Sequence, residues 1–191
     1  MGRWEPNSRE RLFAAALELY AEHGYEQTTV AEIARRAGLT ERTFFRHFPD
    51  KREVLFLGSA VMEEQLTKVV TEAPATASPL TAVAAAIEAV SAGMQERQDS
   101  VLTRQSVVAA HAELRERELI KRAKLAATMA GALGARGVDP LAARLSAEAG
   151  TAVFHVAFER WVEDRGRTRG LVDLVREGFE VLRTVAGGER A

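Results

Sequence analysis

The 191-residue chain has no cysteine, few aromatic residues (6%) and no long apolar run. Without cysteine it can form no disulfide, thiolate metal site or cysteine nucleophile. The longest uncharged segment, residues 73–87, holds two prolines and is shorter than the roughly 20 apolar residues that a membrane span needs. The N-terminal residues lack the apolar run of a signal peptide. We therefore expect a soluble, cytoplasmic protein without membrane partners.

An excess of charge of one sign is also absent, because the net charge is −1 and the pI is about 6.5. The whole chain therefore gives no electrostatic case for nucleic-acid binding. Residues 35–52 differ, since six basic side chains face only two acidic ones there, a net of +4. Any contact with nucleic acid is expected to be confined to this stretch.

Strand-like alternation of β-branched residues is missing, whereas apolar residues recur at helical spacing along most of the chain. The sequence predicts an all-α protein of about nine helices, preceded by an arm at residues 1–7. We expect these helices near residues 8–23, 29–37, 40–48, 50–71, 80–97, 101–110, 112–135, 140–163 and 171–185. The helix at 50–71 is expected to join a domain at 1–52 to a second domain at 53–191.

Residues 28–51 predict two short helices joined by a tight turn. Thr29 and Glu32 have the spacing of a capping box, and Gly38 is placed to end the first helix. Thr40 can cap the next helix, which Pro49 ends. This pattern is typical of a helix-turn-helix, whose second helix enters the DNA major groove. The alternative is an ordinary helical hairpin with a solvated basic face.

The segment RLFAAALELYAEHGYEQTTVAEIARRAGLTERTFFRHFPDKREVL, from Arg11 to Leu55, resembles the TetR family of bacterial transcriptional regulators. The resemblance implies an N-terminal three-helix DNA-binding domain and a C-terminal helical domain for effector binding and dimerisation. It also implies a set of DNA-contacting residues: Thr28, Thr29, Thr40, Arg42, Thr43, Phe45, Arg46, His47 and Lys51.

Within that set, the resemblance assigns groove or base contacts to Thr40, Arg42, Thr43 and Arg46. It assigns phosphate contacts to His47 and Lys51, and a hydroxyl contact to Thr28 or Thr29. Phe45 departs from the family, because many members have Tyr there and a phenolic phosphate contact is lost. We interpret Phe45 mainly as a packing residue.

The second domain shows no catalytic motif, and the resemblance implies an inducer pocket there. The pocket residues we expect are apolar and adaptable side chains, with two polar ones for an anionic head group: Met62, Leu66, Met94, Arg104, His111, Met129, Phe154, Phe158 and Trp161. The alternative for each apolar residue is ordinary core packing. The RTFFRHFPDK and HAELRERE segments look like a subgroup with acyl-CoA-type effectors.

The last two helices combine small residues with larger apolar ones, a pattern that permits close packing in a two-fold four-helix bundle. We expect their dimer interface to contain Leu145, Gly150, Val153, Leu174, Phe179 and Leu182. His155 and Glu159 share a helix face, but a metal site would need further ligands, so we expect neither metal nor cofactor.

The predicted function is a homodimeric, ligand-responsive regulator, most simply a repressor, that binds a palindromic operator and is released by a small molecule. The rival is a helical ligand-binding protein or enzyme whose N-terminal hairpin is only structural.

Overall fold

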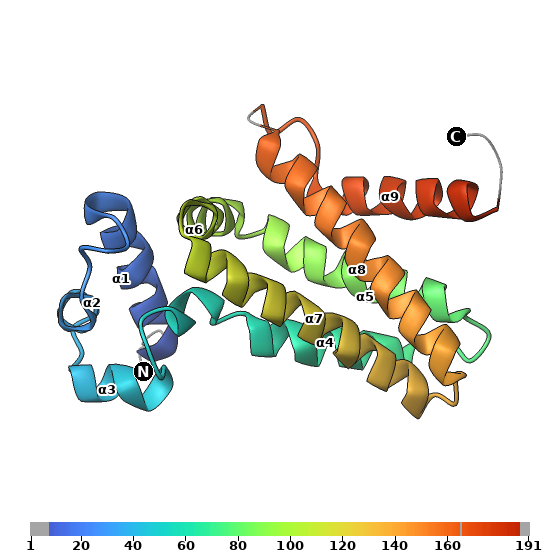
Figure 1. The fold of residues 1–191 in the computed structure, drawn as a ribbon, viewed down its shortest axis with the longest axis horizontal. Coiled ribbons are helices and arrows are strands. Elements are labelled where there is room, and N and C mark those ends of the chain that lie inside the picture. The colour runs from blue at the N-terminus through green and yellow to red at the C-terminus, as the bar shows by residue number, and fades with distance from the viewer. Residues whose placement is uncertain (1–7, 165, 188–191) are drawn as a thin grey trace, which may run out of the picture. The chain divides into compact units, whose positions relative to one another are not determined.

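The structure is a computed structural model that describes residues 8–164 and 166–187, so the expected arm at residues 1–7 lies outside the described part. Within these ranges the chain forms nine α-helices, one short 3-10 helix and no strand, which confirms the all-α prediction (Figure 1). The elements are α1 (Ser8–His23), α2 (Val30–Arg36), α3 (Glu41–His47), η1 (Glu53–Phe56), α4 (Ser59–Glu72), α5 (Pro79–Gln95), α6 (Gln98–Ala110), α7 (Ala112–Ala135), α8 (Pro140–Glu163) and α9 (Leu171–Ala186).

The helices form two compact units. The first holds the described residues up to Ser59 together with Asp99–Glu116, and the second holds Ala60–Gln98 and the described residues from Arg117 onward. This division differs from a single cut after residue 52, because the chain returns to the first unit for most of α6 and the start of α7. A functional boundary at residue 52 stays a prediction.

The core of the first unit is built around α1, which packs against α2, α3 and η1. Leu12, Ile33 and Phe44 are fully buried at its centre. Val108 from α6 and Leu114 from α7 join the same apolar cluster. The core therefore contains side chains from segments more than fifty residues apart in the sequence.

The continuous helix expected at residues 50–71 does not form, so this prediction is wrong. The Asp50 carboxylate accepts hydrogen bonds from the backbone N–H groups of Arg52 and Glu53, at 2.8 and 3.1 Å. These bonds fix the turn just before the short 3-10 helix η1, and α4 begins only at Ser59. Gly58 lies between the two segments, where glycine's poor helix propensity favours an interruption.

The second unit is organised around α5, α8 and α9, which pack against one another (Figure 1). Trp161 and Phe179 are buried among these helices. Gly150 allows the closest approach, because a Cβ atom there would lie 2.2 Å from Cγ1 of Val83 and 3.0 Å from Cδ1 of Ile87. The small residues of α8 therefore serve packing within one protomer. Among the described helices, none is long and apolar enough to cross a membrane.

Candidate nucleic-acid interface and ligand pocket

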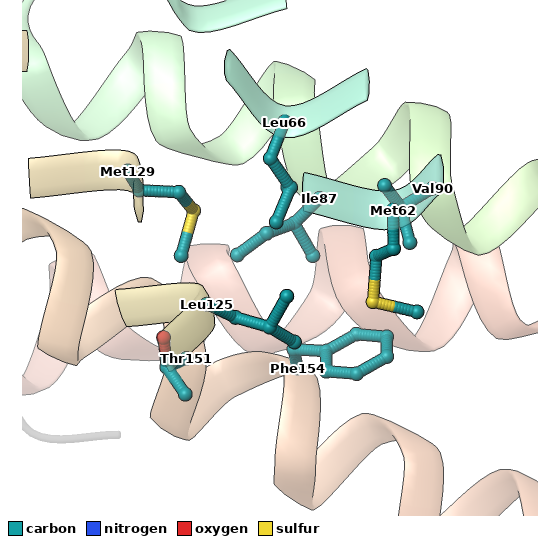
Figure 2. Close-up of a pocket in the computed structure, with 8 residues that line it drawn as sticks. All are labelled: Met62, Leu66, Ile87, Val90, Leu125, Met129, Thr151 and Phe154. Atoms are coloured by element: carbon teal, nitrogen blue, oxygen red, sulfur yellow. The ribbon is translucent and has the colours of Figure 1, made fainter. Parts of the chain in front are cut away.

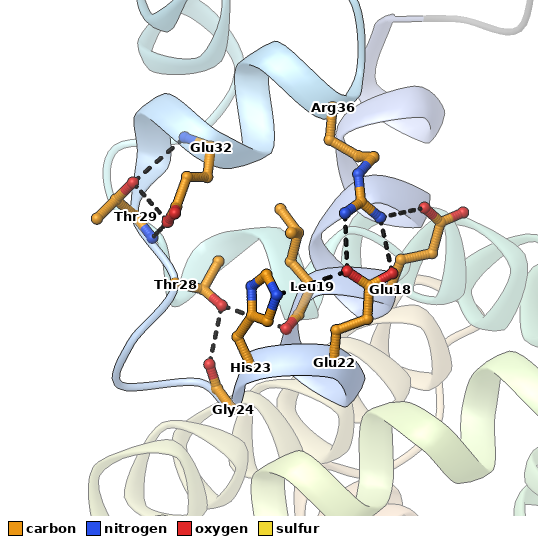
Figure 3. Close-up of polar contacts among 9 residues, drawn as sticks. All are labelled: Glu18, Leu19, Glu22, His23, Gly24, Thr28, Thr29, Glu32 and Arg36. Carbon is orange, nitrogen blue, oxygen red and sulfur yellow. Dashed lines mark hydrogen bonds and ion pairs between the residues drawn. The ribbon is translucent and has the colours of Figure 1, made fainter.

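Both ends of α2 are fixed by local contacts that the sequence predicted. Thr29 Oγ1 accepts from the Glu32 N–H at 3.2 Å, and Glu32 Oε2 accepts from the Thr29 N–H at 2.8 Å, so the capping box is confirmed (Figure 3). Gly38 has a φ of +65°, and the next amide, that of Leu39, donates back to the Ala34 carbonyl oxygen. Such a left-handed residue ends a helix at little cost only when it is glycine.

The short helix α3 is held by its apolar side. Thr40 caps its start by accepting from the Thr43 N–H, and the backbone is extended at Phe48, just before Pro49. Phe44 is fully buried, and its ring centroid lies 5.4 Å from that of Phe48. The opposite side of α3 is consequently presented to solvent.

Ion pairs within the first unit occupy part of its basic surface. Arg36 of α2 lies 3.1 Å from Glu18 and 2.7 Å from Glu22, both on α1 (Figure 3). The hydrogen bond from Arg36 holds the pKa of the Glu22 carboxyl below its ordinary value. Arg52 pairs with Asp50 at 2.8 Å in the same way. Both arginines are therefore committed to contacts within the unit.

The free positive charge is carried by fewer residues than the sequence suggests. Of the six basic side chains in residues 35–52, Arg35, Arg42 and Arg46 are exposed and have no ion pair or hydrogen bond within the described residues. Arg42 and Arg46 lie on α3 itself. Their guanidinium groups are available to bind phosphate or guanine.

Lys51 makes its hydrogen bonds within the first unit, and its expected role as a phosphate contact stays a prediction. Its ammonium group donates to three backbone carbonyl oxygens: those of Tyr25 at 2.8 Å, Thr28 at 3.1 Å and Glu26 at 3.4 Å. An ammonium group has three N–H donors, so each donor has an acceptor. Lys51 therefore stabilises the turn between α1 and α2 by hydrogen bonds to its backbone.

Thr28 also serves the fold instead of a phosphate. Its side chain is 1% exposed, and its hydroxyl donates to the Gly24 carbonyl oxygen at 2.8 Å (Figure 3). Thr29 is exposed, but its hydroxyl donates to Glu32 Oε2 while it caps α2. The expected hydroxyl contact is therefore not available at Thr28.

His47 is half-buried, and its Nε2 atom is enclosed without a hydrogen-bond partner among the described residues. Burial lowers the pKa of the imidazole, and the nearby charges of Arg46 and Arg9 lower it further. Both effects disfavour the charged form of the ring. The expected phosphate contact of His47 stays a prediction.

Phe45 is 54% exposed, so the interpretation as a packing residue is wrong. The packing on this side of α3 is supplied by Phe44, whose ring lies at 81° to that of Phe45 with 5.6 Å between centroids. A single turn of helix thus presents one buried and one exposed phenylalanine.

The second unit contains an apolar pocket between four helices (Figure 2). Eight side chains line it, two from each of α4, α5, α7 and α8: Met62, Leu66, Ile87, Val90, Leu125, Met129, Thr151 and Phe154. The space between them is about 270 Å³, part of it open to solvent. The only hydroxyl in the lining, that of Thr151, donates to the Ala147 carbonyl oxygen at 2.8 Å. No lining residue offers a charge.

Four of the expected pocket residues line this space, namely Met62, Leu66, Met129 and Phe154. The other four lining residues were missed. Leu125 and Thr151 lie one helical turn from the expected Met129 and Phe154, and that spacing could have found them, whereas no such signal marks Ile87 and Val90. Met94 and Phe158 are half-buried outside the lining, and Trp161 is core.

The two polar residues expected at the pocket lie in the first unit instead. Arg104 donates to the Leu55 carbonyl oxygen at 3.2 Å and lies over the Phe56 ring. His111 has its Nδ1 2.9 Å from the Val107 carbonyl oxygen, and its ring contacts that of Tyr25. Their assignment as a head-group site for the ligand is therefore corrected, because both bind the α6–α7 segment to the N-terminal helices.

The residues expected at the dimer interface divide by burial. Val153, Leu174 and Phe179 are buried within the protomer, and Gly150 packs against α5, so these four are corrected to core residues. Leu182 is half-buried, whereas Leu145 is 60% exposed. The exposed apolar residues on α8 and α9 are Leu141, Leu145, Val156, Val181 and Val185.

His155 and Glu159 form an ion pair at 3.2 Å on α8. No group of three or more His, Cys, Asp or Glu side chains gathers around this pair or elsewhere in the described ranges. The pair is a surface contact between successive turns of one helix.

Sequence comparison matches residues 12–56 to the family model "Bacterial regulatory proteins, tetR family". The chain is similar to the transcriptional regulator TcmR of Streptomyces glaucescens, with 40% identity over 83 residues, covering 44% of this chain and 37% of TcmR. It is also similar to the transcriptional repressor AcnR of Corynebacterium glutamicum, with 43% identity over 54 residues and 28% of each chain covered. The chain thus matches about a third of the length of these relatives.

Solved structures extend the similarity to nearly the whole fold. Thermus thermophilus FadR, a TetR-family repressor in complex with lauroyl-CoA, superposes with a TM-score of 0.59 at 22% identity, covering 92% of this chain and 93% of FadR. A complex of SmeT with triclosan gives a TM-score of 0.64 at 21% identity, covering 95% and 90%. At these identities the structures establish the shared fold.

Proposed function

We propose that this chain, whose residues 12–56 match the model of the TetR family of bacterial regulatory proteins, is a homodimeric, ligand-responsive transcriptional repressor of that family. The observation that supports this function best is the solvent face of α3, where Arg42 and Arg46 are exposed and unpaired within the described residues. The second helix of a helix-turn-helix enters the major groove, and arginine binds both phosphate and the guanine edge there.

Two copies of α3 are needed for an operator of useful specificity. A twofold homodimer places its recognition helices in major grooves about one helical turn apart or somewhat more, so the operator is palindromic. We assign the dimer contact to the exposed apolar residues of α8 and α9, because large apolar side chains in one region of a surface favour association.

The effector we propose is a small apolar molecule, or the apolar part of an acyl-type molecule, bound in the pocket of the second unit. The lining is apolar, and two of its residues are methionines, whose flexible side chains adapt to irregular ligands. The cavity itself is only about 20 Å³, far below the roughly 300–1,000 Å³ of established ligand sites, so the lining side chains must move apart for an effector to bind. The lauroyl-CoA and triclosan complexes of the structural neighbours are consistent with this chemistry.

The pocket and the first unit share helix α7. Leu125 and Met129 of this helix line the pocket, while Leu114 near its start is buried in the core of the first unit. An effector that binds one conformation of α7 more tightly shifts the population of both units toward that conformation. This route replaces the helix expected at residues 50–71 as the proposed lever, since that helix is interrupted before Ser59.

The DNA-binding part is tested by a mobility shift on the duplex upstream of the chain's own gene and on duplexes selected from a random-sequence library. The full-length protein should bind with an affinity that falls steeply with salt. Arg42→Ala should lose about 1–3 kcal/mol of discrimination at one base position. Arg144→Ala, an equally exposed arginine on α8, is the matched control and should bind as the wild type does. Absence of binding to any duplex at low salt would favour the ligand-binding protein or enzyme instead.

The effector part is tested by screening small apolar compounds for release of the selected duplex. Leu125→Phe adds volume at the half-buried edge of the pocket and should weaken the effect of an active compound at least about tenfold while DNA binding persists. Thr151→Val should leave the effect unchanged, because the hydroxyl it removes is bonded to the backbone and not offered to a ligand. Equal responses in wild type and Leu125→Phe would place the effector elsewhere.

A further inference from the structure

Phe45 is an apolar ring on a surface that is otherwise suited to DNA. It is 54% exposed, and its ring makes an edge-to-face contact with that of the buried Phe44. Removing such a side chain from solvent is favourable, so an exposed phenylalanine on a binding surface usually meets an apolar partner.

The position of Phe45 on α3 defines where that partner lies. Successive residues of an α-helix are separated by about 100° around its axis. On this basis the exposed residues of α3 form one continuous face. Around the helix axis, Phe45 lies between Glu41 and Arg42, and Arg46 lies on the far side of Arg42. The buried Phe44 points to the other side. Phe45 is therefore close to the middle of the face that carries the two free arginines.

The chemistry of the major groove offers one apolar group on the edges of its bases, the C5-methyl group of thymine. The flanking arginines bind phosphate or guanine, so they bring the ring to this groove and not to an apolar protein surface. Glu41 beside it is disfavoured near phosphate, which favours contact of this part of the face with base edges.

We propose that Phe45 is a specificity-determining residue that contacts the C5-methyl group of one thymine in each operator half-site. The inference rests on the proposed function, because it requires α3 in a major groove. It adds a base preference that Arg42 and Arg46 do not supply, since neither guanidinium group distinguishes thymine from uracil.

The experiment removes the methyl group from the DNA. Each thymine of a duplex selected from a random-sequence library is replaced in turn by deoxyuridine, and the affinity of the full-length protein is measured. Substitution of the contacted thymine should weaken binding about fourfold in one half-site and about fifteenfold in both, as expected for one buried methyl group per site. Other thymines should show little change.

Protein variants separate a direct contact from an effect on DNA shape. Phe45→Ala should bind the thymine and deoxyuridine duplexes equally, whereas Arg42→Ala, the matched control on the same face, should keep the full methyl effect. Phe45→Leu should keep part of it. Because Phe45 is half exposed, Phe45→Ala should unfold at nearly the wild-type temperature, which a thermal melt checks.

Two results would overturn the inference alone: a selected duplex with no sensitive thymine, or a methyl effect that is undiminished in Phe45→Ala. Failure to select any duplex would instead overturn the proposed function, and this inference with it.

Discussion

The Lys51 ammonium group lies 4.2 Å from the centroid of the Tyr25 ring and donates to the Tyr25 carbonyl oxygen at 2.8 Å. This pair ties the residues that follow α3 to the turn that follows α1. The Tyr25 side chain also meets Glu113 at the start of α7, and burial and then the hydrogen bond to Glu113 raise the pKa of the Tyr25 hydroxyl. The orientation of α3, the proposed recognition helix, therefore depends on the hydrogen bonds of Lys51 within the first unit.

Lys51→Met should destabilise the first unit, because it deletes three charge-assisted hydrogen bonds while keeping the apolar stem. The expected loss in the free energy of unfolding is about 1.5–3 kcal/mol, the range for hydrogen bonds to charged groups, and denaturant unfolding measures it. Lys68→Met, at an exposed site on α4, is the control and should be neutral. A salt slope for DNA binding that drops by about one, at unchanged stability, would instead support Lys51 as a phosphate contact.

Asp50 should make the stability of the first unit depend on pH. The hydrogen bond from the Arg52 guanidinium is the main cause that lowers the pKa of this carboxyl, and the backbone N–H groups of Glu53 and Arg52 lower it further. When the pKa of a carboxyl is lower in the folded protein than in the unfolded chain, its charged form stabilises the fold. This contribution is complete above the unfolded-state pKa of about 4 and is lost as the pH falls through the folded-state pKa.

Asp50→Asn should therefore reduce the free energy of unfolding at pH 7 by up to about 1 kcal/mol, the value of a partly exposed ion pair. The difference from wild type should stay constant above about pH 5 and shrink as acid protonates the wild-type carboxyl. Urea unfolding across this pH range measures it. A difference that grows on acidification would contradict the assignment.

Local sequence signals predicted those parts of the structure that depend on neighbouring residues. The Thr29–Glu32 capping box needs only residues three apart, and the helix expected at residues 140–163 is confirmed as α8. The local positive charge was also visible, although the number of free guanidinium groups was not.

Contacts between distant residues could not be predicted in the same way. Lys51 meets the carbonyl oxygens of residues 25–28, and Arg104 meets Leu55 forty-nine residues away. Lys51 was therefore interpreted as a phosphate contact from its position in the family motif, although its ammonium group donates to carbonyl oxygens of the first unit. The exposure of Phe45 was missed because Phe44 and Phe45 point about 100° apart around the helix axis, and only Phe44 faces the core.

Gly150→Ala should destabilise the second unit. The added Cβ would lie 2.2 Å from Val83 Cγ1, and Val83 is itself fully buried and cannot move aside. Overpacking of this kind costs about 1–3 kcal/mol, which calorimetry or denaturant unfolding detects. Gly131→Ala is the matched control, because Gly131 also lies within a helix but has no atom within 4 Å of the added Cβ. It should be neutral or stabilising by up to about 1 kcal/mol. Equal effects of the two substitutions would contradict the close packing of α5 and α8.

The exposed apolar face of α8 and α9 gives a test of the dimer. Leu145→Glu places a charge on a side chain that is 60% exposed in one protomer, so the fold should tolerate it while association should not. Sedimentation should then show a monomer, and affinity for a palindromic duplex should collapse because one recognition helix contacts only one half-site. Leu119→Glu, on a similarly exposed leucine of α7, is the control and should remain dimeric. A wild-type protein that sediments as a monomer, or a Leu145→Glu variant that stays dimeric, would remove this face from the interface.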